Sequence, residues 1–352
     1  MTAFLIIRNK ASTRAHVLNL VQAFLFGCVL RVLCMLAVLL LTATASRAQQ
    51  FAAEWMTVPN AADSHCQWFR HTFVADSSDR LRRASVCVAT DSRFVLYVNG
   101  RNVSTSLFMP GMVTNDIAST MADNSKPVAI TYDVSRFLRP DSNTVALLVA
   151  PEANSRRSPS VAVGFFGTTV SHQLFARQSA EGWMCHESST LLTPEGEMMD
   201  GRSDALSPAY GDMVMAQWCP VVSTATPDGA KIHDLGIAAE SLYGYNTHGY
   251  NPVEDNVVRV VKILFPQDMS FKSHSAVYRF ASGFYGIVRV TLRGCRRGER
   301  ISIGGLDYVC SGEIDEQAYS RFSPRMHGDV VVEGDQWFRP EQIQQVEAIC
   351  MK

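Results

Sequence analysis

The clearest pattern along the chain is an alternation of apolar side chains with a period of two residues. Within residues 85–103, Phe94, Leu96 and Val98 alternate with Val95 and Tyr97, so that each set lies on one side of a strand. The turn dipeptide Asn99-Gly100 follows directly. Asn-Gly adopts the positive φ angles of a tight hairpin turn at little cost. The stretch therefore predicts a β-hairpin.

The same period returns at Val145, Leu147 and Val149, after a turn-rich cluster at residues 139–143. Apolar β-branched and aromatic side chains favour pleated, half-buried surfaces, and two such faces can pack on each other. We therefore expect a β-sandwich. Strands resume at residues 257–265 and again at 287–292, where Val288, Val290 and Leu292 share one face.

Helical periodicity is nearly absent, so the predicted fold class is all-β, with two consecutive β-sandwich or jelly-roll domains. The first domain covers residues 49–222, and its last part, 171–222, is expected to be an irregular connector. Residues 223–256 are predicted to form a linker loop, and residues 257–352 the second sandwich.

Residues 1–48 have the pattern of a cleavable signal peptide. Basic residues, the last of them Arg31, precede an apolar run at 32–41, and small residues occupy 42–48. A retained span at 21–41 is the alternative, but Arg31 inside it would be costly in a bilayer. We therefore predict export, with Gln49 as the first mature residue, to the periplasm, the outer-membrane surface or the medium.

Several stretches resemble the β-domains at the front of bacterial α-L-rhamnosidases and related glycosidases. Their order along the chain is WFRHTF at 68–73, RFVLYVNGR at 93–101, YDVSRFL at 132–138 with NTVALLV at 143–149, GEMMDGR at 196–202, QWCPVV at 217–222, the strand pair at 282–305, SGEIDEQAY at 311–319 and FRPEQ at 338–342. The resemblance implies a galactose-binding-like jelly roll followed by a second accessory β-domain. It also implies that catalysis belongs to an (α/α)₆ barrel, for which residues 49–352 contain no long amphipathic helices.

Glycoside hydrolysis requires two carboxyl groups across the scissile bond. The acids considered for this role lie in a turn-rich stretch and are weak candidates: Glu313, Asp315 and Glu316. We expect them to be solvated surface residues. Nucleophile-elbow and phosphate-loop motifs are absent, and His186 and His248 are expected to be structural. No catalytic residue is predicted, and a non-enzymatic role is preferred.

Charge disfavours nucleic acid as a partner. The chain has 32 basic and 33 acidic residues, and removing residues 1–48 takes away five basic residues and no acidic one, leaving a formal charge of −6. Binding to phosphates needs a basic surface. The basic clusters at 80–83 and 296–297 are expected to be solvated turns.

Seven cysteines follow the predicted leader: Cys66, Cys87, Cys185, Cys219, Cys295, Cys310 and Cys350. Export would permit disulfides, but the number is odd and the pairing cannot be assigned from the sequence. No C-x-x-C motif and no Cys/His cluster at zinc spacing occurs, so no metal site and no cofactor is predicted.

The densest mixture of aromatic and amide side chains lies in a glycine-rich loop and comprises Tyr243, Tyr245, Asn246, His248, Tyr250 and Asn251. Aromatic rings stack on sugars while polar groups bind their hydroxyls, so this loop is a candidate carbohydrate site. The alternative is an interdomain linker whose tyrosines fill the junction between the two domains. Trp55 and Trp337, flanked by polar residues, are further surface candidates, whereas Trp68 and Trp183 are expected in the core.

Three functions remain open. The first is a secreted, non-catalytic accessory protein that binds a rhamnose- or galactose-containing glycan. The second is a part or partner of an α-L-rhamnosidase whose barrel is encoded elsewhere. The third is a structural or protein-interaction module of the cell envelope, with an envelope protein as partner.

Overall fold

A computed structural model describes residues 54–59, 65–74, 78–103, 107–108, 127–151, 158–203, 218–226, 232–237, 257–258 and 260–352. These ranges belong to one compact unit, Ala53–Lys352. They contain β-strands and short 3₁₀ helices, and no α-helix occurs within them. None of these residues forms a helix that could cross a membrane. The predicted leader at 1–48 and the tyrosine-rich loop lie outside the described residues.

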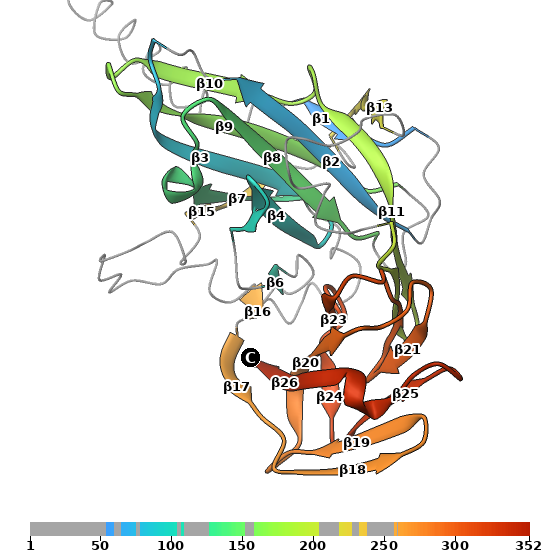
Figure 1. The fold of residues 1–352 in the computed structure, drawn as a ribbon. Helices are drawn as coiled ribbons and strands as arrows, with labels where there is room; N and C mark the ends of the chain where they lie inside the picture. Colours follow the sequence, from blue (N-terminus) through green and yellow to red (C-terminus); the bar gives the residue numbers. More distant parts are fainter. Residues whose placement is uncertain are drawn as a thin grey trace, which may run out of the picture. The chain divides into compact units, whose positions relative to one another are not determined.

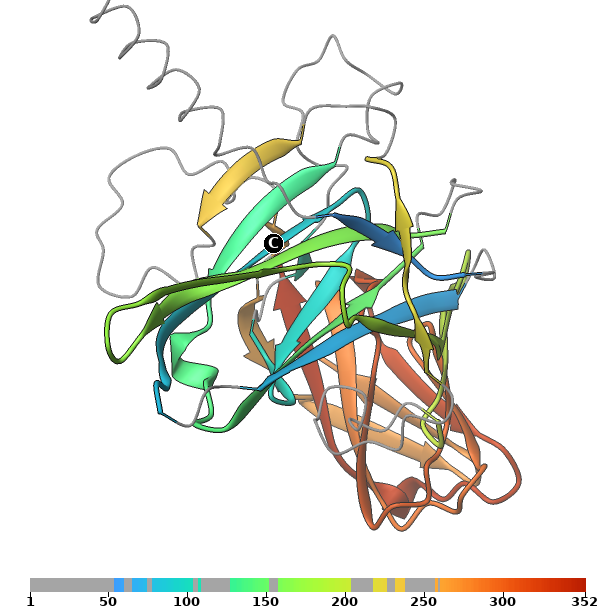
Figure 2. The same ribbon diagram turned by 90° about the horizontal axis from the view of Figure 1, so that it is seen from above.

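The first sandwich consists of two facing sheets (Figures 1 and 2). One sheet has the order β14-β1-β9-β3-β7-β15, with β10 added to β9. Its strands are β1 (Trp55–Thr57), β3 (Leu81–Thr90), β7 (Val128–Asp133), β9 (Ser160–Thr169), β10 (Leu174–Gln178), β14 (Val222–Thr224) and β15 (His233–Ile237).

The facing sheet begins with the order β12-β11-β2-β8-β4-β5, with β13 added to β11. Its strands are β2 (His65–Val74), β4 (Phe94–Val98), β5 (Arg101–Asn102), β8 (Ser142–Val149), β11 (Met184–Thr193), β12 (Gly196–Asp200) and β13 (Cys219–Pro220). Side chains from both sheets, among them Phe69, Leu96 and Val163, form one buried core. The predicted sandwich is confirmed.

The predicted hairpin is also confirmed. Val98 pairs with Arg101, which leaves Asn99 and Gly100 as a two-residue turn with φ angles of 52° and 80°. The Asn99 side chain ties this turn to the neighbouring strand, because its Oδ1 accepts from the Thr144 N–H at 2.9 Å and its Nδ2 donates to Asn143 Oδ1 at 2.9 Å.

The second sandwich also has two sheets. Its strands are β17 (Val260–Leu264), β18 (Asp268–Lys272), β19 (Ser275–Arg279), β20 (Phe284–Arg293), β21 (Arg300–Ile303), β22 (Leu306–Val309), β23 (Asp315–Tyr319), β24 (Arg325–His327), β25 (Val330–Gly334) and β26 (Ile343–Met351). Val288, Val290 and Leu292 point into its buried core, as their alternation predicted. The short 3₁₀ helices are η3 (Ser135–Phe137) and η8 (Pro340–Gln342), and a two-strand pair joins β6 (Leu107–Phe108) to β16 (Val257–Val258).

Strand β12 joins the two sandwiches into a 12-stranded sheet, because it pairs antiparallel with β11 and parallel with β22. Glycines bracket this strand where backbones approach closely. A Cβ on Gly196 would lie 1.8 Å from the Gly305 carbonyl oxygen, and one on Gly201 would lie 2.2 Å from the Tyr308 hydroxyl. These contacts give a physical reason for both glycines in the GEMMDGR stretch.

A third apolar cluster covers the outer face of the β2-β8-β4 sheet. It contains Trp68, Tyr97 and Leu148 from the first sandwich, together with Phe322 from the second. The backbone at Phe322 is fixed from two sides, because Glu197 accepts from its N–H at 2.6 Å and Arg93 donates to its carbonyl oxygen at 2.6 Å. Strand β8 is therefore buried on both faces.

Two expectations about connecting segments are corrected. The predicted irregular connector, 171–222, contains β10, β11, β12 and β13, and the predicted linker, 223–256, contains the end of β14 and the whole of β15. The latter two strands pair with β1 and β7 of the first sandwich. The sequences of β14 and β15 have the composition of loops, but backbone hydrogen bonds to an existing sheet stabilise both strands. The basic cluster at 80–83 likewise enters β3 and is not confined to a turn.

Candidate functional site

A pocket of about 600 Å³ opens on the 12-stranded sheet around β12. It lies where β11, β12, β22, β21 and β25 follow one another across the sheet. The inward side chains of β12, β21 and β22, among them Met199, Ile301 and Tyr308, belong to the second core and lie beneath the pocket. The polar groups described below stand on the opposite, outward-facing positions. Besides His65 of β2, the lining residues belong to these five strands, together with Arg202 and Asp335, which follow β12 and β25.

Strand register places the pocket side chains in two rows. In the first row Met198 pairs with Asp307, Asp307 with Ser302, and Ser302 with Glu333. Residues directly opposite each other on neighbouring strands share one face, so these four groups point into the same space. All four are exposed.

The second row runs from Asp200 through Val309 to Arg300, which are paired in register. Beyond Arg300 lies Asp335, whose carboxylate accepts from the Arg300 backbone N–H at 3.0 Å. The floor of the pocket therefore alternates carboxylates with a guanidinium and a hydroxyl, which are groups that donate to or accept from ligand hydroxyls.

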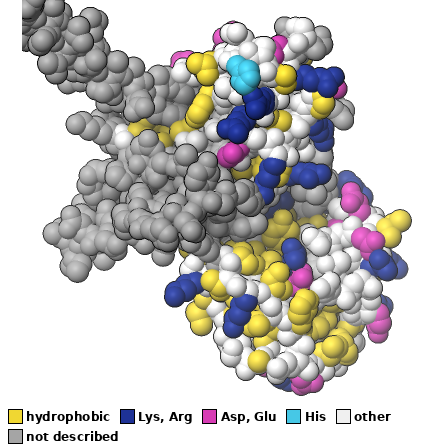
Figure 3. Space-filling view, turned by 90° about the vertical axis from the view of Figure 1, so that its left-hand side faces the viewer, with side chains coloured by type: hydrophobic (Ala, Val, Ile, Leu, Met, Phe, Trp, Pro, Cys, Tyr) yellow, Lys and Arg dark blue, Asp and Glu magenta, His cyan; other side chains and the backbone are white. Residues whose placement is uncertain are grey.

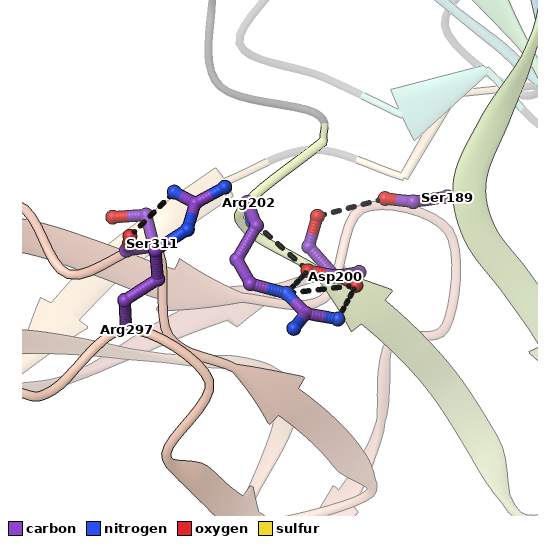
Figure 4. Close-up of polar contacts among 5 residues, drawn as sticks. All are labelled: Ser189, Asp200, Arg202, Arg297 and Ser311. Atoms are coloured by element: carbon purple, nitrogen blue, oxygen red, sulfur yellow. Dashed lines mark hydrogen bonds and ion pairs between the residues drawn. The ribbon is translucent and has the colours of Figure 1, made fainter.

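Asp200 is held in a fixed orientation (Figure 4). Its carboxylate accepts from Arg202 Nε at 2.9 Å and Nη2 at 2.6 Å, and its backbone carbonyl accepts from Ser189 Oγ at 2.9 Å. The hydrogen bonds from Arg202, together with the charges of Arg202 and Arg297, hold the pKa of Asp200 below its usual range despite partial burial.

Apolar contact comes from Leu191 and Met198. Met198 is 44% exposed, whereas Ile301 and Tyr308 are buried beneath the pocket. The arrangement pairs a small apolar surface with several converging polar groups. Such a combination suits a ligand that has hydroxyls on its edges and an apolar face.

Only some of the predicted binding residues lie within the part of the chain that the structure describes. Tyr243, Tyr245, Asn246, His248 and Tyr250 lie outside the described residues, so their role remains a prediction. Trp337 is 45% exposed, and its backbone N–H donates to Oδ1 of the pocket residue Asp335 at 3.0 Å.

The expectation that Trp55 lies on the surface is wrong. Its side chain is 4% exposed, and its strand β1 lies inside the sheet, between β9 and β14. Trp68 and Trp183 are 2% and 1% exposed, as predicted for framework residues.

One of the three acids expected on the surface is also buried. Glu316 is 7% exposed and accepts from the Tyr308 hydroxyl at 2.8 Å, whereas Glu313 and Asp315 are exposed. Position 316 lies on the inward face of β23, one residue after Asp315, so the period of two sends the two acids to opposite faces.

Cysteines meet in two places. Cys185 and Cys219 are register partners on β11 and β13, with their sulfurs 3.5 Å apart. Cys295, Cys310 and Glu316 place their ligand atoms within 4.8 Å of one another. Sequence spacing does not suggest the second group, because the three residues come from separate turns and strands.

Comparison of the sequence with protein-family models gives no match, and comparison with curated proteins gives none either. Solved structures do match. The α-L-rhamnosidase from Dictyoglumus thermophilum aligns with a TM-score of 0.68 at 18% identity, over 86% of this chain and 35% of that protein.

Two further α-L-rhamnosidases match in the same way. The enzyme from Streptomyces avermitilis, solved with L-rhamnose, has a TM-score of 0.63 at 17% identity, over 82% of this chain and 29% of its own. The enzyme from Aspergillus terreus has a TM-score of 0.63 at 15% identity, over 85% and 36%. The chain spans about a third of their length, and its fold is the β-sandwich arrangement found in that part of α-L-rhamnosidases, as its strand motifs predicted.

Proposed function

We propose that this protein is an exported, non-catalytic accessory protein that binds a rhamnose- or galactose-containing glycan. The observation that carries the proposal is the pocket at β12, in which exposed Asp307, Ser302 and Glu333 stand in register beside an apolar surface at Met198. The fold likeness to part of α-L-rhamnosidases supports a deoxysugar such as rhamnose, whose methyl group would use the apolar surface.

Binding is favoured over catalysis by the electrostatics of the pocket. A glycosidase needs a general acid that stays protonated at rest, which requires a raised carboxyl pKa. Arg202 lowers the pKa of Asp200, which suits this carboxyl group to ligand binding rather than to the general-acid role. The resemblance also assigns catalysis to an (α/α)₆ barrel, so we expect no hydrolysis of an aryl α-L-rhamnoside. Turnover above buffer that disappears in Glu313→Gln or Asp315→Asn would revive the enzyme interpretation.

The binding proposal can be tested with a glycan array followed by calorimetry. A shallow sheet surface buries little ligand area, so the dissociation constant should lie between about millimolar and micromolar. Asp307→Asn and Glu333→Gln should weaken binding without lowering the melting temperature. Asp141→Asn and Glu341→Gln are matched controls, because both side chains are exposed and lie outside the pocket.

The tyrosine-rich loop is a second location for the same function. Tyr245→Ala and Tyr250→Ala should weaken binding if the loop contacts the glycan, with unchanged melting temperature. A loss of stability in these variants would indicate a junction instead. Binding that is insensitive to the pocket variants and sensitive to the tyrosine variants would move the site to the loop.

Export is tested separately. Sequencing the N-terminus of the protein recovered from the envelope fraction or the medium should give Gln49 first. A start near Met1 together with carbonate-resistant membrane association would show that the leader is a retained anchor.

The interaction-module alternative has one observation in its favour. Figure 3 shows apolar side chains gathered on one side of the second sandwich, and edge strand β18 is exposed over its full length, with Met269 and Phe271 at 53% and 54% exposure. An unpaired edge can accept a strand from a partner. Met269→Asp with Phe271→Asp should abolish such an interaction and leave glycan binding unchanged.

A further inference from the structure

Two thiols and a carboxyl group meet inside the second sandwich. Cys295 follows β20, Cys310 follows β22, and Glu316 lies in β23; they are 5%, 0% and 7% exposed. One ligand atom from each lies within 4.8 Å of the other two. Three potential metal-binding groups therefore converge at a place that solvent does not reach.

The carboxylate of Glu316 is oriented by its neighbours. The Tyr308 hydroxyl donates to Oε2 at 2.8 Å, and the Ser311 N–H donates to the same oxygen at 2.7 Å. The other oxygen, Oε1, is buried and has no hydrogen-bond partner among the described residues. A buried, unsatisfied carboxylate oxygen is costly, so this position is suited to a cation.

The surroundings are rich in negative charge. Glu299 is 0% exposed; its Oε2 accepts from the Arg296 N–H at 2.8 Å, while its Oε1 is buried and has no partner in the described part of the chain. The charges of Glu316 and Glu299 both act on Cys310. The positive charge of Arg321 acts to lower the pKa of Tyr308, so part of the negative charge around the cluster is balanced.

We propose that Cys295, Cys310 and Glu316 form a structural zinc site. Thiolate and carboxylate are ligands that Zn²⁺ takes in proteins, and hydrogen bonds to a ligating carboxylate are the usual support. Binding would release the thiol protons to solvent and involve no oxidation. A Cys295–Cys310 disulfide is the competing chemistry, but it would leave Glu316 Oε1 without a partner. The site is separate from the glycan pocket, and its function would be to pin the ends of β20 and β22 to β23.

The first test is metal analysis of the full chain, purified in parallel with and without reductant, with the intact mass of the unreduced sample measured under native and denaturing conditions. We expect one zinc per chain, lost on denaturation. Titration of chelator-treated protein with Co²⁺ should produce the thiolate-to-cobalt charge-transfer absorption, saturating at one equivalent. Chelator should lower the melting temperature of the wild-type protein, and added Zn²⁺ should restore it.

Variants identify the ligands. Cys310→Ser and Glu316→Gln should lose the metal, whereas Cys350→Ser, in the same core, and Cys219→Ser, at the other cysteine pair, should keep it. If Cys310→Ser does not fold, the Co²⁺ titration of the wild-type chain still decides. Any of three results would overturn the proposal. The protein could contain no metal and show no cobalt–thiolate absorption, or its mass could be lower by two hydrogens because of a Cys295–Cys310 disulfide. The third result is that both Cys310→Ser and Glu316→Gln keep the metal.

Discussion

Arg202 donates to the carboxylate of Asp200, two residues before it, from Nε at 2.9 Å, from Nη2 at 2.6 Å and from its backbone N–H at 3.0 Å. A bidentate guanidinium–carboxylate contact fixes orientation as well as charge. The orientation of the Asp200 carboxylate, at one edge of the pocket at β12, is therefore fixed without a ligand.

Replacing Arg202 by Lys tests this arrangement. Lysine keeps the charge but cannot form the planar pair of hydrogen bonds, so Asp200 should lose its fixed orientation. We expect glycan affinity to fall by up to about tenfold, the scale of one charge-assisted hydrogen bond, with little change in melting temperature. Calorimetry and thermal melts are the measurements, and Arg177→Lys, exposed on β10 of the first sandwich, is the control. Unchanged affinity would show that Asp200 does not contact the ligand.

Glu197 should be important for stability. It is 1% exposed, and its two oxygens accept from the N–H groups of Arg321 and Phe322 at 2.9 and 2.6 Å. Glu197→Ala would leave both donors without this acceptor, at a cost of about 1–3 kcal/mol for each buried group. Glu197→Gln, which keeps one carbonyl oxygen, should cost less. Urea denaturation measures both, with exposed Glu195→Ala as the control; equal stability of the two Glu197 variants would contradict this account.

Phe322 fills the third apolar cluster and is 0% exposed. Truncation to alanine leaves a cavity against Trp68 and should destabilise the chain by about 3–5 kcal/mol. Because Trp68→Ala opens the same cluster, the two substitutions together should cost less than their sum. Phe166→Ala, at a position that is 40% exposed, is the control for loss of an aromatic ring. Additive effects would mean that the two side chains do not share a cluster.

The pH dependence of stability should contain a term from His71. Burial against Phe73 and Trp183 lowers the pKa of His71, and this outweighs the raising effects of its hydrogen bond to the Gly182 carbonyl and of the Glu181 charge. The unfolded chain then binds more protons, so stability is complete above about pH 6.5 and declines as the pH falls below it.

His327 has the same direction of shift, again caused mainly by burial. Melting temperatures between about pH 8 and pH 5 should therefore fall with pH, and His71→Gln should flatten part of the slope. His172→Gln, on an exposed turn, is the control. A slope that His71→Gln leaves unchanged would rule out this contribution.

Two tryptophans with similar sequence surroundings should behave differently. Trp337 is 45% exposed, so Trp337→Ala should leave the melting temperature nearly unchanged and weaken glycan binding if the ring contacts the ligand beside Asp335. Trp55 is 4% exposed, so Trp55→Ala should destabilise the first sandwich by about 3–5 kcal/mol. Thermal melts separate the two; comparable destabilisation would show that Trp337 is a structural residue.

The local elements of this protein could be predicted from its amino-acid order. Alternation placed Val288, Val290 and Leu292 on one buried face, and Asn99-Gly100 predicted a turn with positive φ angles. These features depend on side-chain direction and backbone sterics within a few residues, which the order of amino acids specifies directly. The strand motifs also predicted the fold that the α-L-rhamnosidase structures share.

The pocket, the cysteine cluster and the burial of Trp55 and Glu316 depend on contacts between distant parts of the chain. Asp200 and Asp335 line one pocket because β12 pairs in parallel with β22, a contact between residues more than a hundred positions apart. A period of two shows which face of a strand is apolar, but it does not reveal what covers the other face. That depends on which distant strands pair and in which register, and the short sequences of β12 and β14 carry little signal for either.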